Sequence, residues 1–427
     1  MLRKYCLTDV MKHHTPEDCW LVIGGKVYDV TEWVPKHPGG SLIYVRAGQD
    51  CTYMFNSYHP LYVWKVLENY FIGELDKSTI IDEKLKLTNV EYMHSYKEPF
   101  YLTLKERVEA YFHKEKINPK IHPQLFIKSV VVLVAYFLIY YLTFFQDHPY
   151  VLSYLYAIGL GYMTTHIALS IMHDDNHGAF SIFPPLSYVM GMSLDLIGAS
   201  SFMWKQQHVI AHHSFTNVNK YDPDIRANDR DMRRHLYLWP LYGLMTLKSF
   251  WFDDLKAFFT GYIGEFPITK MTPLEKKIFW GSKAFYILYA SILPLMFGAY
   301  DWLTILRLYI TSQCYDLRAD EATFTTINLI DGVPTIPYGW AAMQVYSSTN
   351  YCTNSLLWTH LSGALNLQIE HHLFPGVCHM HYPSIQPIVE ATCKEFHIPY
   401  RKHSSFWDAV KAHYKHLKNL GTKSMEP

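Results

Sequence analysis

The stretch SVVVLVAYFLIYYLTFF, residues 129–145, contains no charged residue. Residues 150–172 carry no charge either, and only the short turn QDHP, residues 146–149, separates the two apolar runs. Apolar runs of about 17–25 residues are long enough to cross the hydrocarbon core of a bilayer as helices. The chain is therefore predicted to contain a membrane hairpin, with spans at about 126–145 and 150–172.

A second hairpin is expected further along the chain. Residues 279–300 are apolar apart from Lys283 and predict a third span, and the returning span would have to lie at about 302–330. That segment carries the charged residues Arg307, Asp316, Arg318, Asp320 and Glu321. Each charge near the centre of a membrane helix costs about 2.5–3.5 kcal/mol. Either the segment is not a span, or it contains a local reading-frame error over about 314–328, because suitable codons for CYDLRADE read one base later encode the membrane-like VMTCVLM.

The basic residues Lys114, Lys116 and Lys120 precede the first predicted span. Basic residues collect on the cytosolic side of membrane proteins, so the N-terminus is predicted to be cytosolic, and two hairpins return the C-terminus to the same side. The start of the chain, MLRKYCLTDV, lacks the apolar core of a signal peptide. Segments 186–203 and 236–252 are apolar in patches but short, which favours interfacial or re-entrant pieces.

The length of 427 residues predicts more than one folded unit. Residues 1–76 are typical of a small α+β domain, and 77–124 of a linker with pre-membrane helices. Residues 125–427 are predicted to form an all-α membrane domain, with four spans in two hairpins and a cytosolic helical cap. The 38 basic and 38 acidic residues balance, so the composition indicates no nucleic-acid partner. The seven cysteines are scattered without a CxxC pair, which argues against a disulfide framework or a zinc ribbon.

The N-terminal region contains His37 within the motif HPGG, and a second histidine, His59, follows 22 residues later. A six-coordinate haem needs two imidazoles that face each other across the iron, and Gly39 and Gly40 allow a tight turn close to the porphyrin. Alone, HPGG also fits an ordinary turn in a small domain with surface histidines. Together with VYDVT before it and His59 after it, the stretch resembles cytochrome b5. The resemblance implies that His37 and His59 are the axial ligands of a haem b.

Three clusters of histidine lie just after apolar segments or at their borders. HDDNH (173–177) and HVIAHH (208–213) each contain two histidines four residues apart, which share one face of an α-helix, and QIEHH (368–372) adds an adjacent pair. Neutral imidazole binds iron, copper, zinc or nickel. Any one pair is also expected by chance in a histidine-rich chain. The joint pattern predicts one cytosolic site for two metal ions, formed by His173, His177, His208, His212, His213, His371 and His372.

The other motifs of the chain indicate the chemistry of this predicted metal site. The HExxH motif of zinc proteases is absent from the sequence. A one-electron haem donor on the same chain as a histidine-rich metal site implies redox-active iron and activation of O2, and no catalytic residue is predicted beyond the metal ligands. His166, in the second span, is expected to pack or to form a hydrogen bond. Three further histidines flank the third cluster: His360, His379 and His381. They are expected either to form hydrogen bonds with the metal ligands or to contact the substrate headgroup.

The combination of a cytochrome b5-like domain with HDDNH, HVIAHH and QIEHH resembles the front-end fatty-acid desaturases over nearly the whole chain. The resemblance implies that the seven cluster histidines bind two iron ions and that Gln368 takes the place of a leading histidine in the third cluster. The stretches HHSFTNVNKYDPDIR and EHHLFPGVCH are most similar to the Δ5/Δ6 polyunsaturated branch. One position departs from the family, because related enzymes usually carry a histidine near the end of the fourth span, where this chain has Asn328.

Members of that family use O2 and two electrons to place a double bond between an existing one and the carboxyl end of an acyl chain. For this chain the resemblance implies a multi-pass enzyme of the endoplasmic reticulum membrane. It would take electrons from NADH-cytochrome b5 reductase and act on fatty acyl-CoA or an acyl-phospholipid. A sphingolipid Δ8 desaturase and a fatty-acyl hydroxylase are alternatives within the enzymes. A membrane-anchored haem electron carrier with inert histidine clusters is the alternative from another class.

Overall fold

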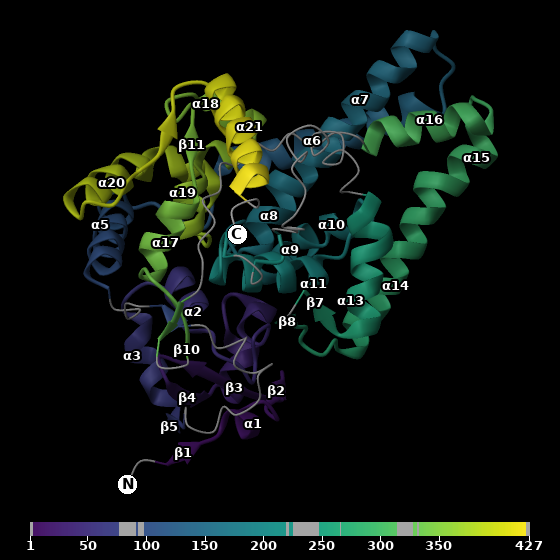
Figure 1. Ribbon diagram of the computed structural model, residues 1–427. Helices are drawn as coiled ribbons and strands as arrows, with labels where there is room; N and C mark the ends of the chain where they lie inside the picture. Colours follow the sequence, from purple (N-terminus) through teal and green to yellow (C-terminus); the bar gives the residue numbers. More distant parts are fainter. Residues whose placement is uncertain are drawn as a thin grey trace.

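The computed structural model describes residues 3–76, 91–92, 98–218, 222–224, 247–264, 266–313, 328–330 and 333–423. Figure 1 shows a small N-terminal domain at the bottom, a group of long helices that extends to the upper right, and a helical cap of mainly C-terminal residues at the left. The N-terminal domain contacts the rest of the chain, for example where Lys105 donates to the Asn56 carbonyl oxygen and Thr269 donates to that of Val45.

The N-terminal domain is built on a five-stranded sheet with the strand order β1-β5-β4-β3-β2. The strands are β1 (Lys4–Tyr5), β2 (His14–Thr15), β3 (Asp18–Ile23), β4 (Lys26–Asp29) and β5 (Phe71–Leu75). Gly24 and Gly25 close the β3–β4 hairpin with φ angles of 62° and 75°, which fits the positive φ angles that a tight two-residue hairpin turn demands. Strand β1 pairs in parallel with β5, so the beginning and the end of the domain meet in one sheet.

Short helices cover this sheet and carry the two histidines of the predicted haem site. They are η1 (Thr31–Lys36), η2 (Gly40–Ile43), α2 (Thr52–Tyr58), α3 (Val63–Leu67) and η3 (Glu68–Tyr70). His37 follows η1 directly, and His59 follows α2. Leu21, Tyr28 and Phe55 belong to the core between sheet and helices. The predicted α+β class of this domain is confirmed.

Three helical segments in the described part of the chain are long and apolar enough to cross a membrane. They are α6 (Pro123–Phe144), then α7 (Tyr150–His166) continued by the π-helix η5 (Ile167–Met172) and α8 (His173–Asn176), and finally α14 (Pro273–Ile287) continued by the π-helix η8 (Leu288–Ile292) and α15 (Leu293–Phe297). Helices α6 and α7 pack against each other as a hairpin. The first three predicted spans coincide with these segments, with ends shifted by a few residues.

A bent pair of apolar segments follows the first hairpin. It contains α9 (Pro184–Gly191), α10 (Ser193–Leu196), α11 (Ser201–Trp204) and the π-helix η6 (Lys205–His212), and its two halves meet at 102°. This bend agrees with a re-entrant piece at 186–203. The other expected piece, 236–252, lies mostly outside the described residues, and the π-helix η7 (Ser249–Asp253) leads into α13 (Asp254–Thr260). Lys283 of the third span is buried and donates to Asp254 Oδ2 at 2.9 Å, which explains a lysine in an apolar run.

The fourth predicted span, 302–330, is not one helix in the residues that the structure describes. Helix α16 (Trp302–Gln313) begins where expected and packs against α7. Residues 314–327 lie outside the described residues, and the reading-frame hypothesis for about 314–328 falls on them except at Asn328. Asn328–Ile330 forms strand β9, which pairs antiparallel with β10 (Val333–Ile336). The prediction of a helix that continues to 330 is wrong, because the backbone groups at its expected end pair in a sheet.

The cap contains the largest hydrophobic core among the residues that the structure describes. Its helices are α5 (Pro99–Glu115), α17 (Trp340–Ser347), α18 (Leu356–Leu361), α19 (Gln368–Leu373), α20 (Tyr382–Glu395) and α21 (Phe406–Lys423). Leu104, Trp340, Ile369 and Ile385 pack in this core. Short strand pairs also occur, with β6 (Glu91–Tyr92) on β10, β7 (Tyr262–Ile263) on β8 (Phe266–Pro267), and β11 (Asn350–Tyr351) on β12 (Lys402–His403). The membrane domain is therefore mostly helical rather than all-α as predicted.

Val134 provides a test of the first span, because it lies on α6 and is 62% exposed. We expect Val134→Arg to weaken membrane insertion of residues 123–144 by about 3 kcal/mol, since a charge near the centre of a span costs that much. Val134→Leu is the matched control and should insert like the original segment. Insertion of the segment into microsomal membranes within a host protein measures the effect, and equal insertion of both variants would contradict the assignment.

Candidate metal centre and haem pocket

His37 and His59 lie close together in the N-terminal domain, with 5.9 Å between their ring centroids and an angle of 52° between the ring planes. Metal–imidazole bonds of about 2.0–2.1 Å place the centroids of two opposed rings about 6 Å apart, so the spacing fits one iron ion between them. His59 Nδ1 lies 2.9 Å from the Phe55 carbonyl oxygen, and His37 Nδ1 lies 3.4 Å from that of Gly40. These contacts favour the tautomer with a proton on Nδ1 and leave Nε2 of each ring for a metal.

The two glycines of the HPGG turn fit for different reasons, the His37 ring at Gly39 and the backbone conformation at Gly40. A Cβ atom at Gly39 would lie 2.8 Å from His37 Cε1, and Gly40 has a φ angle of 55°. Burial lowers the pKa of His37 to about 4 and that of His59 to about 3. Both imidazoles are therefore neutral at physiological pH and able to donate a lone pair. The residues of this pocket fit a haem with two axial histidines.

The first histidine cluster follows a π-helix directly, and most of the second cluster lies within one. His173 follows the π-helix η5, while His208 and His212 lie within the π-helix η6. A π-turn links residue i to residue i+5, so His208 and His213 come to the same side of the segment. Their ring centroids are 4.9 Å apart, and those of His208 and His212 are 4.8 Å apart. The sequence predicted an α-helical face shared by two histidines, but the wider winding brings all three histidines of this cluster to one site.

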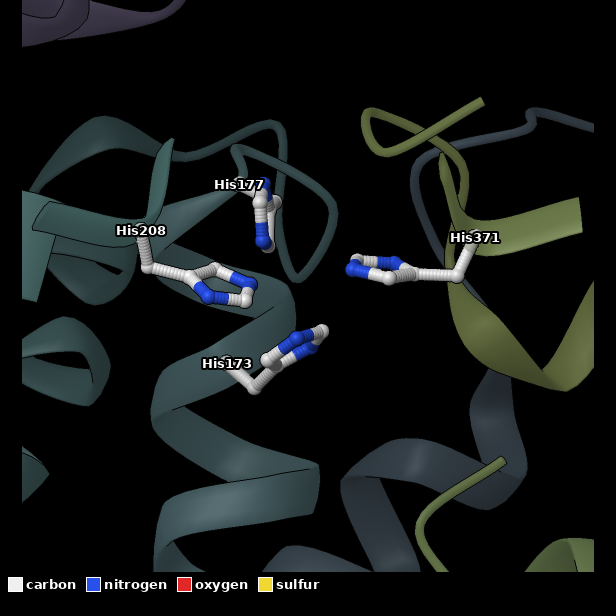
Figure 2. A group of neighbouring side chains, drawn as sticks. All are labelled: His173, His177, His208 and His371. Carbon is white, nitrogen blue, oxygen red and sulfur yellow. The ribbon is translucent and has the colours of Figure 1, made fainter. Parts of the chain in front are cut away.

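Four histidines from the three clusters point toward one another in Figure 2. His173, His177, His208 and His371 each offer one nitrogen atom, and these four atoms all lie within 4.8 Å of one another. Four ligand atoms at about 2.0–2.1 Å from one metal ion lie within roughly 4 Å of each other. A small contraction therefore suffices for this group to hold one ion. Helix α19 of the cap completes a site that begins on the membrane helices.

A second group of histidines adjoins the first. His212, His213 and His372 have ring centroids 4.9 to 5.5 Å apart, and the His213 ring also lies 4.7 Å from that of His371. Gln368 Nε2 lies 2.8 Å from His372 Nε2, which places Gln368 at the edge of this second group. All eight predicted metal-site residues are thus brought together, in two adjoining groups.

Polar side chains behind these histidines hold the rings through Nδ1. His208 Nδ1 contacts Asp224 Oδ2 at 2.9 Å, and His212 Nδ1 contacts Asp222 Oδ2 at 2.9 Å. The other pairs are His371 Nδ1 with Tyr382 Oη at 3.2 Å, His372 Nδ1 with Gln344 Oε1 at 3.1 Å, and His177 Nδ1 with the hydroxyl of Tyr58. Metal-binding histidines almost always donate their second ring N–H in this way, which directs the other nitrogen toward the ion. Sequence reasoning did not assign these partners, although the motif YDPD (221–224) just after the second cluster was an available signal.

The cluster is buried, and burial favours the neutral form of several of its imidazoles. Burial, followed by the neighbouring histidines, lowers the pKa values of His177, His213, His371 and His372 well below the usual range. Among the described residues, Nε2 of His177, His208, His213 and His371 is buried without a hydrogen-bond partner. Such unpaired polar atoms cost free energy, and a transition-metal cation accepts several imidazole lone pairs at once. The donor set therefore fits a histidine-rich metal centre.

Comparison with known proteins agrees with this geometry. Residues 148–404 match the family described as fatty acid desaturase, and residues 7–76 match the cytochrome b5-like haem/steroid binding domain. The acyl-lipid (8-3)-desaturase of Physcomitrium patens is 51% identical over 98% of this chain and 92% of its own. The Delta(5) fatty acid desaturase A of Dictyostelium discoideum is 33% identical over 98% and 94%, and the acyl-lipid (8-3)-desaturase of Mortierella alpina is 30% identical over 98% and 97%. The chain belongs to the fatty acid desaturase family.

This desaturase is a front-end acyl-lipid type with a fused cytochrome b5 domain, which confirms the resemblance seen in the sequence. The cytochrome b5 domain implies a haem, and the desaturase family implies a di-iron centre with which the histidine cluster is consistent. The family is membrane-bound, in agreement with the apolar helices. The role of each individual histidine stays a prediction that the variants below test.

The histidines outside the three clusters differ in their surroundings. His166 is buried in the second span, and its Nδ1 lies 3.3 Å from Ser170 Oγ, as expected for a packed residue. His379 Nδ1 lies 2.8 Å from Asp174 Oδ2, so His379 stands behind the first cluster of the desaturase. The Asp174 carboxylate also accepts a hydrogen bond from the His379 backbone N–H at 2.9 Å. This contact ties the first cluster to the chain that follows the third.

Two variants, His208→Ala and His59→Ala, test the metal cluster and the haem pocket of the desaturase independently. We expect His208→Ala to lose most of the non-haem iron and to keep its haem, because only the metal cluster loses a ligand. His59→Ala should lose haem and keep non-haem iron. Total iron and haem absorbance of the purified variants measure both quantities, with the buried His166→Ala as control. A His208→Ala variant with its full iron content would contradict the ligand assignment.

Asp224→Asn tests whether a side chain that forms a hydrogen bond with a metal ligand affects metal binding. Although burial by itself raises the pKa of Asp224, the nearby His212 and His208 outweigh it and hold the pKa far below the usual range, so the group is a carboxylate. Loss of such a partner typically weakens metal binding about 10- to 100-fold. We expect this loss when the metal-stripped desaturase is titrated with Co²⁺. Asp9→Asn, at an exposed position of the N-terminal domain, is the control, and equal affinity in both variants would refute the role of Asp224.

Proposed function

We propose that this desaturase introduces a Δ5 double bond into polyunsaturated acyl chains esterified to membrane lipid. The observation that carries the proposal is the convergence of seven histidines from three distant clusters beside a docked cytochrome b5 domain. The sequence left Δ5 and Δ6 open. The names of the three relatives, two acyl-lipid (8-3)-desaturases and one Delta(5) desaturase, support Δ5 and a lipid-bound substrate.

The proposed iron ligands follow the two groups of histidines. One ion is held by His173, His177, His208 and His371, and the other by His212, His213 and His372 with Gln368 at its edge. When bound, the two iron ions supply the activation of O2 that attack on an unactivated C–H bond requires. The imidazole nitrogen atoms would hold these ions without adding negative charge to the site.

The protein contributes positioning and exclusion of water. Asp222 and Asp224 hold two imidazoles by charge-assisted hydrogen bonds, and Gln344 and Tyr382 hold two others. Burial of the cluster keeps bulk water from the reacting carbons. The apolar spans around the site give an acyl chain a path from the bilayer, and the depth to which the chain enters selects the carbons.

The proposed electron path begins at NADH-cytochrome b5 reductase and continues to a haem b between His37 and His59. The fused domain replaces a separate cytochrome. We place the enzyme in the endoplasmic reticulum membrane with both termini in the cytosol, where the reductase meets the N-terminal domain. Domain limits of 1–76, 77–124 and 125–427 complete this proposal.

Expression in yeast that is fed defined fatty acids tests the reaction. We expect an acid whose first double bond lies at Δ8 to gain a new double bond at Δ5, and an acid that begins at Δ9 to gain little at Δ6. Mass spectrometry of derivatised fatty acids locates the new bond, and His371→Ala should abolish it. New double bonds in sphingolipid bases with unchanged fatty acids, or hydroxylated acyl chains, would contradict the proposal in favour of a related enzyme.

A further inference from the structure

The haem domain and the metal cluster meet at the end of helix α2. Tyr58 is the last residue of α2, and the predicted haem ligand His59 follows it directly. The Tyr58 hydroxyl forms a hydrogen bond with Nδ1 of His177, and the two rings lie nearly parallel, 6.0 Å apart with an interplanar angle of 17°. One side chain therefore connects the neighbour of a haem ligand to a histidine of the first cluster.

The segment that carries Tyr58 and His59 is fixed on the desaturase side by a buried lysine. Lys105 of α5 is 3% exposed, and its Nζ donates to the Asn56 carbonyl oxygen at 2.8 Å and to the His59 carbonyl oxygen at 2.7 Å. Glu109, one turn further along α5, accepts a hydrogen bond from the Leu61 backbone N–H at 3.0 Å. These bonds hold the chain on both sides of Tyr58, so its contact with His177 belongs to a built interface.

A glycine after the third cluster permits the close approach. A Cβ atom at Gly376 would lie 3.2 Å from Tyr58 Cδ1 and 3.7 Å from the Tyr58 carbonyl oxygen. The loop that follows the third histidine cluster therefore packs directly on the tyrosine. Two clusters of the metal centre, the first through His177 and the third through this loop, contact the same residue of the haem domain.

Tyr58 differs from the other residues that hold the histidine rings. Asp222, Asp224, Gln344 and Tyr382 all come from the desaturase part of the chain. Tyr58 comes from the haem domain instead. Among the described residues, it is the haem-domain side chain that forms a hydrogen bond with a cluster histidine. Nε2 of His177 is buried without a hydrogen-bond partner. With a metal ion bound at Nε2, Nδ1 would carry the proton and donate it to the tyrosine oxygen.

We propose that Tyr58 is a positioning residue that orients His177 for metal and joins the two redox centres. The path from the His59 ring runs through the backbone to Tyr58 and across one hydrogen bond to His177, so it contains a single non-covalent step. Each transfer oxidises the haem by one electron and reduces the metal centre by one electron. An external flavoprotein reductase then reduces the haem again before the second electron of the turnover. The inference rests on the proposed function, because it requires both centres to be redox-active.

Tyr58→Phe removes the hydroxyl and keeps the ring, and Tyr62→Phe is the matched control because Tyr62 is 67% exposed. The first readout is the Co²⁺ affinity of the metal-stripped, haem-loaded full-length protein. We expect Tyr58→Phe to bind Co²⁺ about 10- to 100-fold more weakly at one site, as for other residues behind a ligand. Haem absorbance should be unchanged, which shows that the haem domain remains folded.

The second readout is electron transfer without turnover. The haem is reduced under anaerobic conditions in protein saturated with ferric iron, and its oxidation by the metal centre is followed by absorbance. We expect at least a tenfold slower oxidation in Tyr58→Phe than in Tyr62→Phe. Lys105→Met leaves the tyrosine hydroxyl in place but removes the hydrogen bonds that fix its segment. We expect this variant to slow haem oxidation as well. It replaces Tyr58→Phe if that variant does not fold.

Two results would overturn the inference. One is a Tyr58→Phe variant with the affinity and oxidation rate of Tyr62→Phe, and the other is a weaker Co²⁺ affinity with an unchanged oxidation rate. In either case a wild-type protein that still desaturates fatty acids in yeast leaves the proposed function intact. A wild-type protein that binds no metal beyond its haem iron would instead refute the proposed function.

Discussion

Buried imidazole nitrogen atoms that face one another without hydrogen-bond partners are the constraint on which the rest of the structure depends. In the described part of the chain, Nε2 of His177, His208 and His371 is in this state. Protonation does not relieve it, because burial and neighbouring histidines both oppose a second positive charge. A metal cation satisfies several such lone pairs at once. Formation of this region and metal binding are therefore coupled, as in other proteins whose ligands meet only in the folded state.

The architecture brings those ligands together from three distant parts of the chain. The second span supplies the first cluster, the bent re-entrant pair supplies the second, and helix α19 of the cap supplies the third. π-Helical winding decides which histidines of the second cluster reach the site, and π-turns frequently occur at functional sites. The haem domain docks where Tyr58 meets His177. An electron donor and a metal centre are thus adjacent within one chain, which gives the donor a high effective concentration.

The sequence predicted His37 and His59 of the haem pocket, the seven cluster histidines and three spans. The spacing of ligands and the length of apolar segments are local properties of a sequence. The sequence missed the contact of Tyr58 with His177, because the two residues are far apart in the chain and only the docked fold brings them together. The π-helical turns were missed as well, since nothing in HVIAHH distinguishes them from an α-helical face. The fourth span was predicted to reach residue 330, but pairing of β9 with β10 depends on a partner strand that hydrophobic length does not encode.

The ratio of iron to haem in the purified full-length protein tests the central claim most directly. Extraction from membranes under conditions that retain metal, followed by total iron analysis and haem absorbance, gives this ratio without any assay of activity. The account predicts three iron atoms for each haem, one within the haem and two held by the histidine cluster. A ratio of one iron atom to one haem, with no other transition metal bound, would contradict it and would leave the histidine clusters without the cation that their geometry requires.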